Sequence, residues 1–311
     1  MAQMTAIVDK LLTQASSMYV PEGYISEMIL PEISVVQKTG KLGKYGTNHL
    51  RIESSLVGGR GAYKQVESIT RSQSTYSVDT FGLRGLVTAD DYRNVENPYN
   101  AELDESMGLQ TLLWLRKEKS LADTLLSTSI ITSNVTLSGT DQYDDYTASD
   151  PLGDFSTARA TVRGNCGALA NTAIMDWRTK NVLKFHPQLL DFLGFKESRP
   201  GGLSDDELSR ALDVERVLVA NAMYESAPEG QSSSLAAIWG KDILFCVAPV
   251  RAMVRQVSLG YRIQLAGMPP RRVLKYAENN PPGSTAIICD DSFDMFISNA
   301  TAAYLIKAVV A

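Results

Sequence analysis

The chain has 311 residues, of which 44% are hydrophobic and 21% are charged, and its net charge at pH 7 is -5. This length fits one large or two ordinary domains, and the composition is that of a folded chain rather than a disordered one. The mildly negative charge argues against a general coat for nucleic acid, and three widely spaced cysteines argue against a disulfide framework.

The N-terminal region predicts a short helix followed by an extended arm. Residues 3–17 fit the helix, in which Asp9 and Lys10 interrupt the apolar core that a signal peptide needs. Pro21 and Pro31 follow, and a proline pushes the residue before it toward extended conformations. We therefore expect the chain to leave the helix as an extended arm.

The next region, residues 33–88, predicts a long β-hairpin. It is rich in Ser, Thr, Val, Gly and Tyr, and two alternating runs flank the segment VGGRGAY. Gly58, Gly59 and Gly61 fit the turn of that hairpin. Both faces are polar, and a strand pair with so little apolar surface is not stable alone in water. We therefore expect the hairpin to lie on another subunit.

A segment at the start of this region, KTGKLGKYG, has three glycines among three lysines. Glycine and lysine are the residues of phosphate-binding loops, but neither the P-loop spacing nor the dinucleotide-binding spacing occurs here. The residues that follow alternate as a strand does, whereas a phosphate loop opens a helix. The segment therefore does not predict a nucleotide site.

The clearest helix is predicted from Asn97 to about Ser127. Asn97 is a suitable N-cap, and Pro98 suits the first helical position. A helix of this length would span about 45 Å, and a single apolar stripe is typical of a structural spine. The stripe consists of Leu103, Met107, Trp114, Leu121 and Leu125.

The remainder predicts short helices and strands, which makes the class α+β. A Ser/Thr/Asp-rich connector, residues 127–156, precedes a helix over about 156–170 and a buried strand at NTAIMD. The segment TKNVLKFHPQLLDFLGF predicts one helix, and Ser204 and Glu207 form the capping box of the next. Two apolar runs, RVLVANAMY and DILFCVAPV, predict strands on either side of a long loop, and further strands flank a Pro-Pro-Gly turn near the C-terminus.

Candidate chemistry is sparse. Cys166 could act as a nucleophile with His186, but such a pair needs a third group and an oxyanion site, and the chain has only two histidines. The cysteine spacing excludes a zinc site, and a calcium loop would need the EF-hand spacing, which an acidic cluster does not meet. We therefore expect no catalytic, cofactor or metal site. The acidic cluster comprises Asp141, Asp144, Asp145 and Asp150.

The order of these segments resembles that of tailed-phage major capsid proteins of the Hong Kong 97 fold. The arm YVPEGYISEMILPEISVV leads into the polar hairpin, as the N-arm leads into the E-loop of that family. The segment NPYNAELDESMGLQTLLWLRKEKSLADTLL stands where the family has its spine helix, and Trp239 and Gly240 match a Trp-Gly pair that commonly precedes a buried strand. The resemblance covers most of the chain and depends on the order of segments rather than on one motif.

The resemblance implies an α+β capsid fold in four parts. These are an N-terminal arm (1–32), an extended β-hairpin or E-loop (33–88), a peripheral domain with the spine helix (89–172 and 292–311) and an axial domain (173–291). It implies that the structural core includes Leu103, Met107, Trp114, Leu121 and Trp239. It implies assembly contacts by Lys41, Lys44, Arg51, Arg60, Tyr63 and Lys64.

In such a fold the segment KTGKLGKYG lies at the foot of the E-loop. Its glycines would bend the backbone there, and its lysines would pair with acidic patches on neighbouring subunits or face water. The glycines are Gly40, Gly43 and Gly46, and the lysines are Lys38, Lys41 and Lys44.

The resemblance also implies a non-enzymatic protein without cofactors. Many copies would form the hexamers and pentamers of an icosahedral head around double-stranded DNA, assembled in the host cytoplasm without a membrane. No long helical segment precedes the arm, which suggests a separate scaffolding protein, and a portal is a further expected partner. The alternatives are an encapsulin-like nanocompartment shell, a tail-tube or other virion protein, and an α+β hydrolase that uses Cys166.

Overall fold

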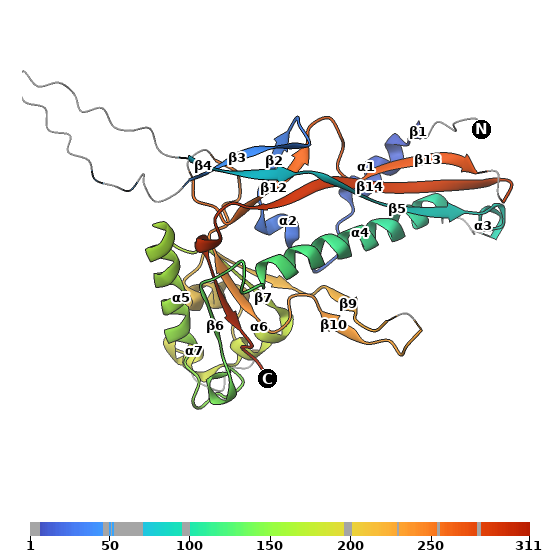
Figure 1. Cartoon of the computed structure of the whole chain (residues 1–311). Helices are drawn as coiled ribbons and strands as arrows, with labels where there is room; N and C mark the ends of the chain where they lie inside the picture. Colours follow the sequence, from blue (N-terminus) through green and yellow to red (C-terminus); the bar gives the residue numbers. More distant parts are fainter. Residues whose placement is uncertain are drawn as a thin grey trace, which may run out of the picture.

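The computed structural model describes residues 7–45, 50, 52, 71–94, 100–195, 201–228, 230–253, 256–278 and 281–311. It has two bodies (Figure 1). One is elongated, with a long sheet lying along a helix, and the other is a smaller sheet surrounded by short helices. No helix among the described residues is both long and apolar enough to cross a membrane.

The long sheet has the order β1–β13–β14–β12–β2, and β5 also pairs with β14. Within the described residues, β12 and β2 form the only parallel pair of this sheet. The central strand β14 pairs along one side with β13 and then β12, and along the other side with β5. The strands are β1 (Ile7–Val8), β2 (Glu32–Val35), β5 (Asp79–Val87), β12 (Gly260–Leu265), β13 (Arg272–Glu278) and β14 (Ser284–Ile297).

The spine helix is α4 (Ala101–Leu125), which is about 37 Å long at 1.5 Å per residue. Its N-cap is Asn100, whose side-chain oxygen accepts the backbone N–H groups of Glu102 at 3.0 Å and Leu103 at 3.4 Å. The predicted cap at Asn97 is therefore wrong. Both asparagines precede the apolar stripe, but the carboxamide of Asn100 reaches the free N–H groups of the first turn.

Helix α1 (Lys10–Met18) lies beside the spine helix (Figure 1). Asp9 caps it and accepts the N–H groups of Leu11 and Leu12. The predicted helix over 3–17 is thus too early at its start, because β1 adds to the edge of β13 immediately before the cap. Apolar side chains of both helices and the long sheet share one core, which includes Leu12, Val87, Leu109, Leu113, Val273 and Ile287.

The second sheet has the order β6–β15–β11–β7–β8. Helices α5, α6, α7 and α8 lie around it, and their apolar faces share its core. The strands are β6 (Asn134–Thr136), β7 (Thr172–Asp176), β8 (Arg216–Ala220), β11 (Ile243–Cys246) and β15 (Ala303–Lys307). The helices are α5 (Pro151–Cys166), α6 (Trp177–Lys184), α7 (Pro187–Phe192) and α8 (Asp205–Leu212).

Two helix predictions in this body need correction. The helix expected at 156–170 begins at Pro151 after the cap Asp150, and it ends before Gly167, whose φ of 73° is the left-handed conformation that glycine tolerates. The segment expected to be one helix is two, α6 and α7, because Pro187 cannot continue a preceding helix. The capping box of Ser204 and Glu207 is present at α8 as predicted.

The remaining elements are short. The loop expected between the two apolar runs contains a small antiparallel hairpin, β9 (Met223–Glu225) with β10 (Leu235–Ala237), which projects beneath the spine helix (Figure 1). Helices α2 (Ser26–Ile29) and α3 (Ala89–Asn94) flank the spine, and 3-10 turns occur at Gly139–Asp141 and Ala300–Ala302. Strands β3 (Thr39–Tyr45) and β4 (Arg71–Ser77) form a separate ribbon.

The two sheets divide the chain at different residues from the expected peripheral and axial domains. Strands β12, β13 and most of β14 fall in the range expected for the axial domain, but they build the long sheet with β5. Strand β15 falls in the range expected for the peripheral domain, but it pairs with β11 in the second sheet. An apolar run marks a strand without marking its partner, so the sequence could not assign these strands to a sheet.

Candidate assembly surfaces and the arm–spine junction

The β3–β4 ribbon is the described part of the predicted hairpin. Its seven residue pairs run from Thr39 with Ser77 to Tyr45 with Arg71. Lys38 and Lys41 are exposed, and neither forms an ion pair within the described part of the chain.

Two glycines of the ribbon do not bend the backbone as predicted. Gly40 and Gly43 lie inside the regular strand β3. A Cβ atom at Gly40 would lie 2.6–2.8 Å from three atoms of the Tyr76 side chain, which is far closer than van der Waals contact. Gly40 therefore lets the Tyr76 ring lie directly on the backbone, and the predicted bend at Gly40 and Gly43 is wrong.

The other predicted assembly residues are only partly described. Lys44 belongs to β3, where its backbone pairs with Ser72, but its side chain lies outside the described residues. The remaining four assembly residues, and Gly46, lie outside the described residues altogether. These four are Arg51, Arg60, Tyr63 and Lys64.

Among the expected core positions, Trp114, Leu121 and Trp239 are buried, with exposed fractions of 3%, 1% and 1%. Leu103 and Met107, near the start of the spine helix, are only partly buried. Leu103 still packs against the core that α1, the spine helix and the long sheet share.

A buried carboxylate holds the arm to the spine helix. Glu118 is fully buried, and its two oxygens accept three hydrogen bonds. The donors are the backbone N–H of Ile25 at 3.2 Å, the backbone N–H of Ser26 at 2.8 Å and the indole N–H of Trp239 at 2.7 Å. Glu118 thus joins the arm, the spine helix and the loop before β11 at one point. We call Glu118 and these three donors the arm–spine junction.

An ion network lies next to this junction. The ammonium of Lys117 is 2.8 Å from a carboxylate oxygen of Glu27 and 3.5 Å from one of Asp291. Arg262 also pairs with Glu27, and Arg271 approaches it to 3.7 Å. Burial raises the pKa of Glu27, but Lys117, Arg262 and Arg271 together outweigh that effect and lower it. The arm helix α2 is therefore held to the spine helix and the long sheet by charge as well as by packing.

The two residues of the alternative nucleophile site engage other groups. The Cys166 thiol donates to the carbonyl of Val162 at 3.0 Å, and burial raises its pKa, which disfavours the reactive thiolate. The imidazole of His186 lies 3.0 Å from the hydroxyl of Ser149. A nucleophile needs a base within hydrogen-bond reach, and the described contacts of Cys166 provide none.

The acidic cluster stabilises its own loop. Asp145 accepts the N–H groups of Thr147 and Ala148, and Asp150 caps α5 by accepting the N–H of Gly153. Within the described ranges, no group of three or more His, Cys, Asp or Glu side chains could hold a metal ion. These carboxylates thus act as turn and cap residues in the structure.

Comparison with known proteins gives a consistent result. No family model matches the chain. The chain is 25% identical over 280 residues to the major capsid protein of Burkholderia phage BcepMu, an alignment that covers 85% of each. Its fold matches a phage-related protein of Bordetella bronchiseptica RB50, with a TM-score of 0.75, 22% identity and 98% of each chain covered. It also matches the capsid of cyanophage P-SCSP1u, with a TM-score of 0.56, 11% identity and coverage of 93% and 89%. The chain is thus related to the major capsid proteins of bacteriophages and has the Hong Kong 97 fold.

Proposed function

We propose that the chain is the main structural protein of a phage head, and that many copies form the hexamers and pentamers of an icosahedral shell around double-stranded DNA. The observation that carries the proposal is the relation to a phage major capsid protein over 85% of both chains, together with the shared fold. A virion location, assembly in the host cytoplasm, and a separate scaffolding protein and portal as partners belong to the same proposal.

The surfaces of the chain suit repeated association. The β3–β4 ribbon lies at one end of the long sheet, where Leu42 and Tyr76 pack on it, and it presents Lys38 and Lys41 to solvent (Figure 1). An interface between stable partners typically buries about 1,600 Å² in total, and the exposed side of the ribbon would contribute part of such an area. Each contact can be modest, because many contacts act together in a closed shell.

We further propose that the chain has no enzymatic role. Its relatives are structural proteins by name, and the best candidate nucleophile, Cys166, is a buried thiol with a raised pKa. A net charge of -5 also fits, because DNA held by confinement and counterions does not require a strongly basic coat.

Electron microscopy of the purified protein, alone and with a candidate scaffolding protein, tests the proposal. We expect closed polyhedral particles or hexameric and pentameric rings. Tubes would instead indicate a tail protein, and a chain that stays monomeric under every condition would contradict a shell role. Closed particles that hold protein cargo and exclude DNA when produced with the other phage proteins would favour a nanocompartment.

A further inference from the structure

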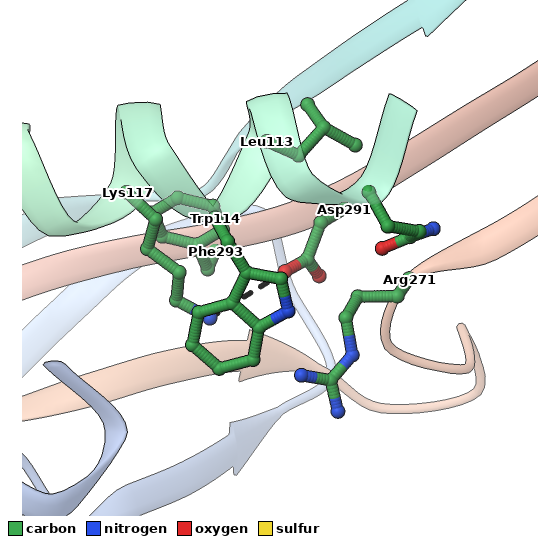
Figure 2. Close-up of a pocket in the computed structure, with 7 residues that line it drawn as sticks. Leu113, Trp114, Lys117, Arg271, Asp291 and Phe293 are labelled. Carbon is green, nitrogen blue, oxygen red and sulfur yellow. Dashed lines mark ion pairs between the residues drawn. The ribbon is translucent and has the colours of Figure 1, made fainter. Parts of the chain in front are cut away.

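A small chamber lies between the middle of the spine helix, strand β14 and the turn that carries Arg271 (Figure 2). The space open to the centre of a water molecule is about 10 Å³, which is about the room that one bound water needs. All seven lining residues are buried, with exposed fractions from 0% to 9%. They are Gln110, Leu113, Trp114, Lys117, Arg271, Asp291 and Phe293.

Several polar atoms of this lining are buried without a hydrogen-bond partner among the described residues. The acceptors are one carboxylate oxygen of Asp291 and the amide oxygen of Gln110. The donors are the indole N–H of Trp114, the Nε–H and one terminal N–H of Arg271, and the amide N–H groups of Gln110. The amide nitrogen of Gln110 has only the sulfur of Cys289 nearby, which is a weak acceptor. Leaving so many buried polar atoms unpaired is costly, so the chamber calls for a polar occupant.

The charges around the chamber favour a neutral occupant. The Lys117 ammonium already lies 3.5 Å from Asp291, and Arg271 lies 3.7 Å from Glu27 and stacks at 4.9 Å on the Trp114 ring. Figure 2 shows Asp291 and Arg271 both beside the Trp114 indole, with the Asp291 carboxylate paired to Lys117. An anion would face the Asp291 carboxylate, and a cation would face Arg271 and Lys117. A molecule that both donates and accepts satisfies both kinds of free atom.

We propose that this chamber binds one structural water molecule that bridges the spine helix, β14 and the Arg271 turn. The water donates to the free oxygens of Asp291 and Gln110 and accepts from the Trp114 indole or the Arg271 guanidinium. A water with two to four such partners is held firmly inside a protein. Nothing in this site depends on the shell function.

The bridge also reaches helix α1. Arg271 has a φ of 53°, which is the left-handed conformation that a non-glycine residue rarely adopts. Its carbonyl accepts the Ser16 hydroxyl at 3.0 Å, and its guanidinium donates to the Ser17 carbonyl at 2.7 Å. A water on the remaining guanidinium N–H groups helps fix this strained turn, and thereby positions the end of α1 against the spine helix.

A crystal or electron-microscopy map that resolves buried waters elsewhere in the chain tests the proposal. We expect a single peak about 2.7–3.2 Å from the free oxygen of Asp291 and from the amide oxygen of Gln110. A map with ordered waters elsewhere and none in this chamber would overturn the proposal. An anomalous bromide peak at the site after a halide soak would also overturn it, in favour of an anion.

Two variants, each with a side chain of similar volume to the one it replaces, test whether the polar atoms or only the size of the chamber hold the water. Gln110→Met removes both polar groups of the amide, and we expect the peak to disappear or to lose most of its height. Leu113→Met changes the apolar wall and leaves every polar atom in place, so the peak should remain. An unchanged peak in Gln110→Met, or its loss in Leu113→Met, would contradict a water held by these polar atoms.

Discussion

Glu118 shows how one buried side chain fixes the arm. Its carboxylate accepts two backbone N–H groups of the arm and the indole N–H of Trp239. We expect Glu118→Gln to lower the free energy of unfolding by about 1–3 kcal/mol, because the amide would turn a donor toward a buried donor. Urea denaturation of the dissociated subunit measures this loss.

Glu225→Gln is the matched control for that variant. Glu225 also accepts backbone N–H groups, from Ala227 and Ser234, but its carboxylate is fully exposed on the β9–β10 hairpin. Water can replace those bonds, so the midpoint of denaturation should stay close to that of the parent chain. An equal loss for both variants would show that burial of Glu118 is not what matters.

His186 should make stability depend on pH. Its ring is buried against Ser149 and Tyr146, and this burial lowers its pKa, although the Asp150 carboxylate acts in the opposite direction. The unfolded chain therefore takes up a proton more readily than the folded chain as pH falls below about 6.5. Stability contributed by the neutral ring is present above that pH and is lost as the pH falls.

The variant His186→Gln isolates this effect. Between about pH 7 and pH 5 its unfolding free energy should fall less than that of the parent chain, measured by denaturant midpoints at each pH. The two proteins must be compared with each other at each pH, because other groups also change the stability. Buried carboxyls with raised pKa values, such as those of Asp176 and Asp242, stabilise the folded chain as the pH falls. Parallel pH profiles for the two proteins would contradict the assignment to His186.

The sequence predicts the large buried residues better than the polar ones that join segments. Trp114 and Trp239 stand out because apolar aromatic residues in helical or strand patterns are usually buried. Glu118 does not stand out as a buried residue, since its neighbours in the segment LRKEKS suggest a solvated helix face. Only the fold brings the arm backbone and the Trp239 indole to it.

At the scale of elements, the cap of the spine helix can be tested directly. Asn100→Ala removes the oxygen that accepts the N–H groups of Glu102 and Leu103, and should cost about 1 kcal/mol of unfolding free energy. Asn100→Asp keeps an acceptor at the same place and should retain the stability. Thermal denaturation of both variants distinguishes them, and equal melting temperatures would show that the cap is not needed.

Helix existence was predictable, whereas helix boundaries were not. The stripe of the spine helix has the period that its burial requires, so its interior could be derived. Its start could not, because Asn97 and Asn100 are both good caps and their difference is one of geometry. The break between α6 and α7 was signalled by Pro187, and weighing that proline more heavily would have found it.

At the scale of the molecule, the exposed lysines of the β3–β4 ribbon should matter only between subunits. Replacing Lys38 and Lys41 together by Glu should leave the melting temperature of the isolated subunit unchanged, because both side chains are solvated. Assembly should fall sharply if the lysines meet acidic patches on neighbours. Sedimentation velocity and electron microscopy of the assembly reaction measure this loss.

The charge-conserving double variant, Lys38→Arg with Lys41→Arg, is the control and should assemble as the parent chain does. Normal shells from the Glu variant would contradict an electrostatic role for this ribbon. A lowered melting temperature of its isolated subunit would instead point to a contact inside the chain.

The order of segments along the chain was enough to suggest the fold, which the capsid structure of cyanophage P-SCSP1u shares. The sequence was not enough to predict which strands belong to which sheet. Pairing between Arg262 and Glu32, or between Cys246 and Thr172, joins residues far apart in the sequence. Periodicity is a local signal, so it carries no record of such partners.

The long sheet has one more consequence, for synthesis. Its first strand, β1, pairs with β13 at Lys275, and β2 pairs with β12 at Arg262. Strand β5 must wait for β14, which ends at Ile297. During synthesis these three early strands therefore stay without their partners until residues 260–297 have been made. Unpaired strand edges that persist for so long can pair wrongly, so this sheet is the part of the chain most open to misfolding while it is being made.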